Sequence, residues 1–118
     1  MKKKLLLMAL LTLLVGTFTS CERFIENNLP VLYVVNGADY AAKVYCDNWP
    51  IANVSSHNNS GKIILTDVSI NLPVLVEVYF YKNGSYINKK IAWEDYYFKL
   101  GKSYKMTLTN SGGSLQPL

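Results

Sequence analysis

The segment VLVEVYFYKNGSYINKKIAW, residues 74–93, decides the fold class. Apolar and polar side chains alternate along 74–82 and again along 85–93, which is the period of a half-buried β-strand. Asn83-Gly84 between them is a strong short-range hairpin signal, because a type I′ turn needs positive φ at both central residues. The segment therefore predicts an antiparallel hairpin with a two-residue turn.

The turn also predicts which residues of the hairpin face each other. The apolar face would pair Val74 with Trp93, Val76 with Ile91, Val78 with Lys89 and Phe80 with Ile87. The outward face would pair Leu75 with Ala92, Glu77 with Lys90, Tyr79 with Asn88 and Tyr81 with Tyr86. Strict alternation specifies the faces, because a one-residue slip would turn the charges inward. Lys89 is the misfit: either it extends along the sheet margin, or the register changes there.

Short β-branched and aromatic runs separated by turn residues continue on both sides of the hairpin. They predict further strands at Val31–Val35, Tyr40–Cys46, Lys62–Val68, Tyr96–Leu100 and Ser103–Thr109. Asn36-Gly37 predicts a hairpin turn, with a longer loop through Ala38-Asp39 as the alternative. Residues 51–61 are polar and predict a loop. In the last strand Tyr104, Met106 and Leu108 would point inward, and residues 111–118 would form a tail without a strand.

About seven strands in under 90 residues are typical of an all-β protein, a small antiparallel two-sheet sandwich of immunoglobulin-like or transthyretin-like type. The Cys-Trp-Cys spacing of a true immunoglobulin domain is missing from the sequence.

The first residues read as an export signal. Lys2, Lys3 and Lys4 precede an apolar run from Leu5 to Val15, broken only by Thr12. This order and length fit a secretory signal peptide. As a helix the run would span only about 17 Å, against about 30 Å of membrane hydrocarbon, so we do not expect a stable span.

The end of this leader, Phe18-Thr19-Ser20-Cys21, resembles the lipobox of bacterial lipoproteins. The usual motif has Leu where Phe18 stands. The resemblance implies that the leader is cut before Cys21, that the Cys21 thiol is diacylated, and that the new amino terminus is often acylated too. It covers only the leader and the cysteine. An ordinary secretory signal, cut elsewhere with Cys21 incidental, is the alternative.

This interpretation divides the chain into a removed signal peptide at 1–20, a lipidated cysteine with a short tether at 21–28, a β-sandwich domain at 29–110 and a tail at 111–118. The whole chain has 12 Lys+Arg and 8 Asp+Glu. Removing the leader and its three lysines leaves 9 against 8, a net charge of only +1. This charge gives no reason to expect nucleic acid as a partner.

Residue types offer little for catalysis, metal or a cofactor, and we expect none of the three. His57 is the only histidine and lies in the polar loop beside Ser56, where neighbouring side chains usually diverge. One histidine and Cys46 cannot supply a structural zinc site. The acids Asp47, Asp67, Glu94 and Asp95 lack the spacing of a calcium loop. Cys46 alternates with Val44 and Ala42, which predicts a small buried side chain.

Exposed aromatic rings are the one feature with binding potential. The hairpin register places Tyr79, Tyr81 and Tyr86 outward, and Trp49 or Trp93 adds a larger ring. Such rings contact protein partners or stack on sugars, although tyrosine is also simply a favoured strand residue. We therefore expect a membrane-anchored protein of the cell envelope, at the outer membrane or cell surface, with the periplasmic face of the membrane as the alternative. It would act as a non-catalytic interaction or structural module for an envelope protein. A carbohydrate-binding lipoprotein that recognises a glycan is the alternative.

Overall fold

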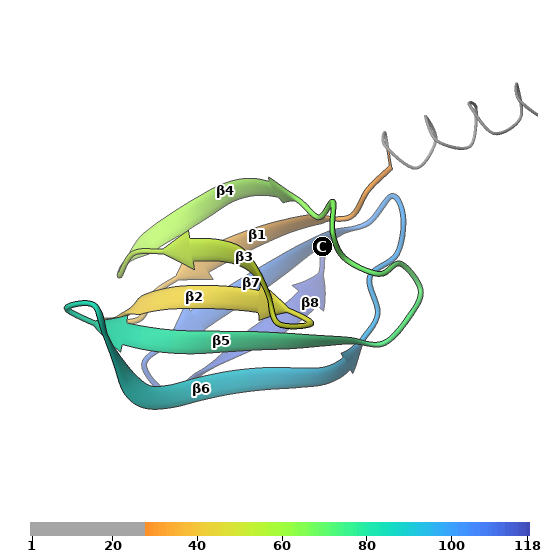
Figure 1. Cartoon of the computed structure of the whole chain (residues 1–118). Helices are drawn as coiled ribbons and strands as arrows, with labels where there is room; N and C mark the ends of the chain where they lie inside the picture. The colour runs from red at the N-terminus through yellow and green to blue at the C-terminus, as the bar shows by residue number, and fades with distance from the viewer. Residues whose placement is uncertain (1–27) are drawn as a thin grey trace, which may run out of the picture.

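The computed structural model describes residues 28–118, which form an eight-stranded β-sandwich (Figure 1). The strands are β1 (Val31–Asn36), β2 (Ala41–Cys46), β3 (Trp49–Val54), β4 (Asn58–Ile64), β5 (Val74–Lys82), β6 (Ser85–Tyr96), β7 (Ser103–Thr109) and β8 (Gly112–Pro117). They form two four-stranded sheets in the orders β4-β1-β7-β8 and β3-β2-β5-β6. The predicted all-β sandwich is confirmed.

The strand order can be compared with that of an immunoglobulin domain. An immunoglobulin domain of the constant type places strands A, B, E and D in one sheet and C, F and G in the other. Here the first strand shares no sheet with the second and pairs in parallel with the seventh, so the four-plus-four order differs from that arrangement. The second and fifth strands are antiparallel neighbours, as strands B and E are in the immunoglobulin order. The structure therefore shows a two-sheet sandwich whose strand order matches the constant-type immunoglobulin order only in part.

The central hairpin has the predicted turn but a different register. Asn83 and Gly84 both have positive φ, and Tyr81 lies opposite Tyr86 as expected. Between this pair and Tyr79↔Lys90, β6 uses two more residues than β5, in a bulge where Asn88 has a φ of 56°. The pairings predicted beyond the bulge are therefore wrong by two residues as far as Val76, which lies opposite Trp93. A second irregularity makes the predicted partner of Val74 wrong by three, since Val74 lies opposite Tyr96. The inward and outward sets survive, because side chains alternate with a period of two.

Lys89 is the physical reason for this bulge. The predicted register would have placed its charge against Val78 in the core, and the bulge instead puts Ile91 there. The Lys89 ammonium lies over the rings of Tyr40 and Phe80, 5.7 and 5.5 Å from their centroids. Both alternatives considered for this residue hold, since the register changes and the side chain reaches the sheet margin.

Several predicted connections are wrong because turn residues do not reveal which strands pair. Residues 51–61, expected to be a loop, contain most of β3 and the start of β4, and β4 ends four residues earlier than the strand predicted there. The Asp47-Asn48 pair, with φ of 48° and 67°, makes the tight β2–β3 turn. Asn36-Gly37 joins strands of different sheets, so it is no hairpin turn.

The C-terminal part also differs from expectation. Residues 111–118 are not a tail without a strand, because β8 pairs along β7 from Thr109↔Gly112 to Tyr104↔Pro117. The predicted strand at 96–100 is absent: β6 runs on to Tyr96, and Phe98 makes one isolated bridge to Ile70. The β7 bounds are confirmed, and its predicted inward residues Tyr104, Met106 and Leu108 are buried.

The core lies between the sheets and follows the alternation of the strands. Leu32 and Val34 of β1 face Val76, Val78 and Phe80 of β5 across it, all at most 1% exposed. Cys46 is buried there as predicted, and burial raises the pKa of its thiol to about 12, so the thiol stays protonated.

The predicted leader at 1–20, the lipidation of Cys21 and nearly all of the tether at 21–28 lie outside the described residues. Within residues 28–118, no helix has the length and apolar character to cross a membrane.

Candidate functional site

The outer surface of the β3-β2-β5-β6 sheet carries a cluster of aromatic and charged side chains, which we call the tyrosine face. Odd-numbered residues of β2 and β5 point away from the core, because their even-numbered neighbours fill it. Across the β5–β6 hairpin, the even-numbered residues of β6 share this outward side. The tyrosine face consists of Lys43, Tyr45, Glu77, Tyr79, Tyr81, Tyr86 and Lys90.

The tyrosine rings meet edge to face rather than as a flat row. Tyr45 and Tyr79 lie 5.5 Å apart between ring centroids with planes at 89°. Tyr86 contacts Tyr79 at 5.6 Å and Tyr81 at 5.7 Å, with planes tilted by 59° and 51°. Such geometry is favoured by the ring quadrupoles and stabilises the ring contacts. Its members are half-buried except Tyr86, which is 41% exposed.

Two lysines cover ring surfaces in this cluster. The Lys43 ammonium lies 4.4 Å from the centroid of Tyr81, and the Lys90 ammonium lies 5.3 Å from that of Tyr79. A cation over a ring is attracted by its negative face. The faces of Tyr79 and Tyr81 are therefore partly occupied by side chains of the protein itself.

Glu77 lies beneath the rings and is only 4% exposed. Its Oε2 accepts a hydrogen bond from Tyr79 Oη at 2.8 Å and pairs with Lys90 Nζ at 2.6 Å. The expected Glu77–Lys90 pair is thus present, but it is diagonal, since Ala92 lies directly opposite Glu77. Lys90 is the main cause that lowers the pKa of the Glu77 carboxyl, with the Tyr79 hydroxyl adding to it. Glu77 also lines a pocket of about 190 Å³ with Tyr45, Asn48, Tyr79 and Tyr81.

The Glu77 contacts predict an acid-dependent loss of stability. A carboxyl whose folded pKa lies below its ordinary 4.5 stabilises the fold above that value, and this contribution disappears as the pH falls through the folded pKa. The difference in melting temperature between wild type and Glu77→Gln should therefore shrink as the pH falls from about 6 to about 2. Thermal melts at several pH values measure it. A difference independent of pH would contradict this assignment, and Asp39→Asn controls for the second carboxyl whose pKa is lowered.

The structure gathers three of the four aromatic residues chosen from the sequence. Tyr79, Tyr81 and Tyr86 lie together on the tyrosine face, uncovered by the second sheet. Trp49 lies apart: it pairs with Cys46, whose side chain points into the core, so the register places Trp49 on the other side of the sheet. Trp93 packs half-buried against the core. Tyr45, which lies opposite Glu77, was missed, although the alternation of β2 could have placed its side chain on the outward side.

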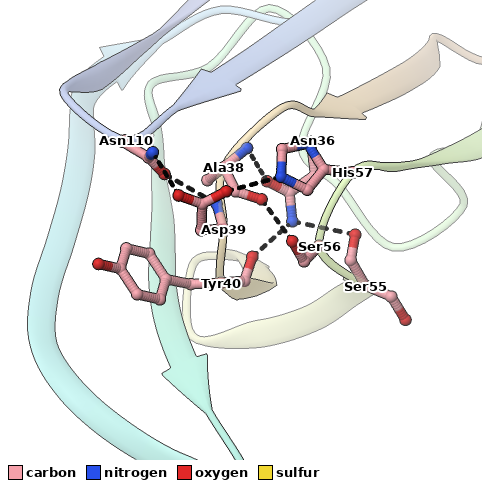
Figure 2. A network of polar contacts seen from close by, with 8 residues as sticks. All are labelled: Asn36, Ala38, Asp39, Tyr40, Ser55, Ser56, His57 and Asn110. Carbon is pink, nitrogen blue, oxygen red and sulfur yellow. Dashed lines mark hydrogen bonds and ion pairs between the residues drawn. The ribbon is translucent and has the colours of Figure 1, made fainter.

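A second polar cluster joins three connections at one end of the sandwich (Figure 2). Asp39 accepts a bond from Asn110 Nδ2 at 2.8 Å and lies 2.7 Å from His57 Nε2. These contacts, with His57 first, lower the pKa of the Asp39 carboxyl. His57 is exposed as predicted but has a partner, which its position in the sequence did not reveal. The cluster ties the β1–β2, β3–β4 and β7–β8 connections together.

Beneath this cluster, the buried side chain of Asn36 fixes two crossings between the sheets (Figure 2). Its Nδ2 donates to the carbonyl oxygens of Tyr40, Val54 and Ser55 at 2.9, 3.1 and 3.2 Å. Its Oδ1 accepts from the Ala38 amide at 3.0 Å. Asn36 thereby supplies hydrogen bonds to backbone groups of both crossings, a role for which its sequence position gave no signal.

The Ser56, His57 and Asp39 side chains do not form a catalytic relay. Ser56 Oγ donates to the Ala38 carbonyl oxygen at 2.7 Å, whereas a nucleophilic serine would donate to the histidine. The side chains of His57 and Asp39 are 62% and 60% exposed, so neither is shielded from water. Over residues 28–118 no three His, Cys, Asp or Glu side chains group together in a way that suits a metal ion.

The chain matches no protein-family model and no curated protein sequence.

Proposed function

We propose that this protein is a lipid-anchored component of the bacterial cell envelope whose sandwich is a non-catalytic module that binds a protein partner through the tyrosine face. The anchor rests on Phe18-Thr19-Ser20-Cys21. The single observation that supports the binding surface is the cluster of tyrosine rings in mutual contact on a sheet face that the second sheet leaves open. Tyrosines held in place contribute large contact area at little entropic cost, which is why they dominate protein-binding hot spots.

The ring geometry favours a protein partner over a glycan. Sugar stacking needs an open ring face, and the Lys43 and Lys90 ammonium groups lie over Tyr81 and Tyr79. The rings are also tilted against each other rather than coplanar. The lysines offer charges for an acidic partner surface, at a place where the tyrosine hydroxyls supply hydrogen bonds. Glycan binding remains the second candidate, supported by the small pocket with a buried carboxylate at Glu77.

Mass spectrometry of the protein isolated from membranes tests the anchor. The expected N-terminal peptide begins at Cys21 and carries fatty acyl chains, and Cys21→Ser should release the protein from the membrane fraction. Two or three chains anchor firmly because each buried methylene contributes about 0.8 kcal/mol. A protein retained in the membrane with an unmodified Cys21 would contradict the anchor.

The double substitution Tyr81→Ala/Tyr86→Ala tests the binding surface. Truncating two central rings should weaken partner binding about thirtyfold or more, since a single hot-spot residue contributes about 2 kcal/mol or more. The measurement is quantitative cross-linking in membranes, followed by affinity determination with the captured partner. Tyr33→Ala is the matched control, because Tyr33 is a half-buried strand tyrosine on the outer side of the other sheet. Equal capture by all three proteins, or saturable glycan binding that the double variant abolishes, would refute the protein-partner assignment.

A further inference from the structure

Large exposed apolar side chains gather at one end of the sandwich. Six such residues occur among residues 28–118, and all but Tyr86 lie where the chain enters β1. This entry end is formed by the β2–β3 turn, the end of β4, residues 65–73, residues 97–102 and the end of β8 (Figure 1). Its exposed residues are Trp49 at 57%, Ile64 at 51%, Leu72 at 58%, Tyr97 at 49% and Leu118 at 72%.

Hydrogen bonds fix these segments to one another at the entry end. Asn71 N–H donates to Phe98 O at 2.8 Å, which joins residues 65–73 to residues 97–102. Asp47 N–H donates to Leu75 O at 2.8 Å, which brings the β2–β3 turn to the same place. Leu118 N–H donates to Ser103 O at 2.8 Å, beside Val31, the partner of Ile64. The segments that carry the exposed apolar residues are therefore held together by backbone hydrogen bonds.

The two ends of the molecule differ in chemistry. The opposite end carries the Asp39–His57–Asn110 cluster and the Asn83-Gly84 turn, both polar. Single exposed apolar residues are ordinary in proteins and need no partner. Their concentration at one end, including a tryptophan and a tyrosine, is the pattern of side chains that favour the boundary between water and lipid.

The length of chain before the sandwich identifies what this end can reach. Asn28 is bonded into the entry end, where its carbonyl oxygen accepts from the Gly101 amide at 2.6 Å. Seven residues from Glu22 to Asn28 separate the sandwich from Cys21, and seven residues reach about 25 Å at most. An acylated Cys21 would keep the entry end within that distance of the bilayer, with the opposite end farther away.

We propose that the entry end rests in the headgroup layer of the bilayer that holds Cys21, an inference that depends on the anchor proposed above. Burial of the apolar residues drives the contact. Lys99 and Lys102 line an open groove of about 520 Å³ beside Tyr97, where lipid phosphates can be met. Asp67 is exposed at this end and Asp95 lines the same groove, so net charge is not the driving force. The strands then stand upright on the membrane, and the tyrosine face points sideways, free for a partner.

The fluorescence of Trp49 tests this orientation. The acylated protein carrying Trp93→Phe, which leaves Trp49 as the only tryptophan, is placed in vesicles of phosphatidylcholine and phosphatidylglycerol with or without brominated acyl chains. Its emission should shift to shorter wavelength than in detergent-free buffer without vesicles, and brominated lipid should quench it. Hydrogen exchange on the acylated chain with both tryptophans gives a second measurement, in which amides in 65–73 and 97–102 should slow on vesicles.

Matched charge substitutions provide the control. Leu72→Glu should abolish most of the quenching and of the slowed exchange, whereas Ser111→Glu, which adds the same charge in the exposed β7–β8 turn, should leave both unchanged. An acylated protein whose Trp49 emission and amide exchange ignore the vesicles would overturn the membrane contact and leave the anchor intact. A protein whose mass shows no acyl chain would instead refute the anchor, and this inference with it.

Discussion

Replacing Asn36 with alanine should lower the free energy of unfolding by about 3 kcal/mol. The side chain is 1% exposed, and its amide bonds three carbonyl oxygens and one N–H in two crossings between the sheets. Alanine would remove the partner of all four groups, and the bonds to Val54 O and Ala38 N–H are buried. A buried group without a partner costs more than the loss of the bond alone. For a domain of this size the melting temperature should fall by about 15 °C.

Asn110→Ala is the control for Asn36. Asn110 also bridges two groups of one residue, donating to Asp39 Oδ2 and accepting from Asp39 N–H. It is exposed, so water replaces its bonds, and the substitution should cost less than about 1 kcal/mol. Chemical denaturation of both variants measures the difference. Equal destabilisation by the two substitutions would show that burial does not decide the contribution of Asn36.

Phe98→Ala should destabilise the protein by about 4 kcal/mol, because a large ring is lost from a packed interior. Phe98 is fully buried, with ring centroids of Tyr96 and Tyr104 both 5.1 Å away. Its backbone also bridges to Ile70 and bonds Asn71. The ring therefore closes the core beneath two connections that have no regular strand of their own.

Tyr97→Ala is the matched control in the adjacent position. The Tyr97 ring is 49% exposed, so its truncation should change the unfolding free energy by no more than about 0.5 kcal/mol. Thermal melts of both variants suffice to compare them. A small effect of Phe98→Ala would mean that residues 97–102 fold independently of the core.

Alternation made the outward tyrosines predictable, and tertiary demands made the register unpredictable. Tyr79, Tyr81 and Tyr86 point outward in any register that keeps the faces, because a shift of two residues preserves them. The bulge that produces this shift keeps the charge of Lys89 out of the core, because it places Ile91 and not Lys89 opposite Val78. The burial of Glu77 was equally out of reach, since its neighbours include Tyr45 on a strand that is distant in sequence.

The sequence by itself determined the strands with clear alternation, the Asn83-Gly84 turn and the inward sides of β2, β5, β6 and β7, because these depend on neighbours one or two residues away. It also supplied the Phe18-Thr19-Ser20-Cys21 motif on which the proposed anchor rests. Only the tertiary structure decided that the Asn36-Gly37 segment connects the two sheets instead of two paired strands, and that residues 112–117 form β8. It also decided that Trp49 lies at the entry end and not in the tyrosine cluster. Those features depend on which distant strand lies alongside, and a local pattern of side chains carries no information about that partner.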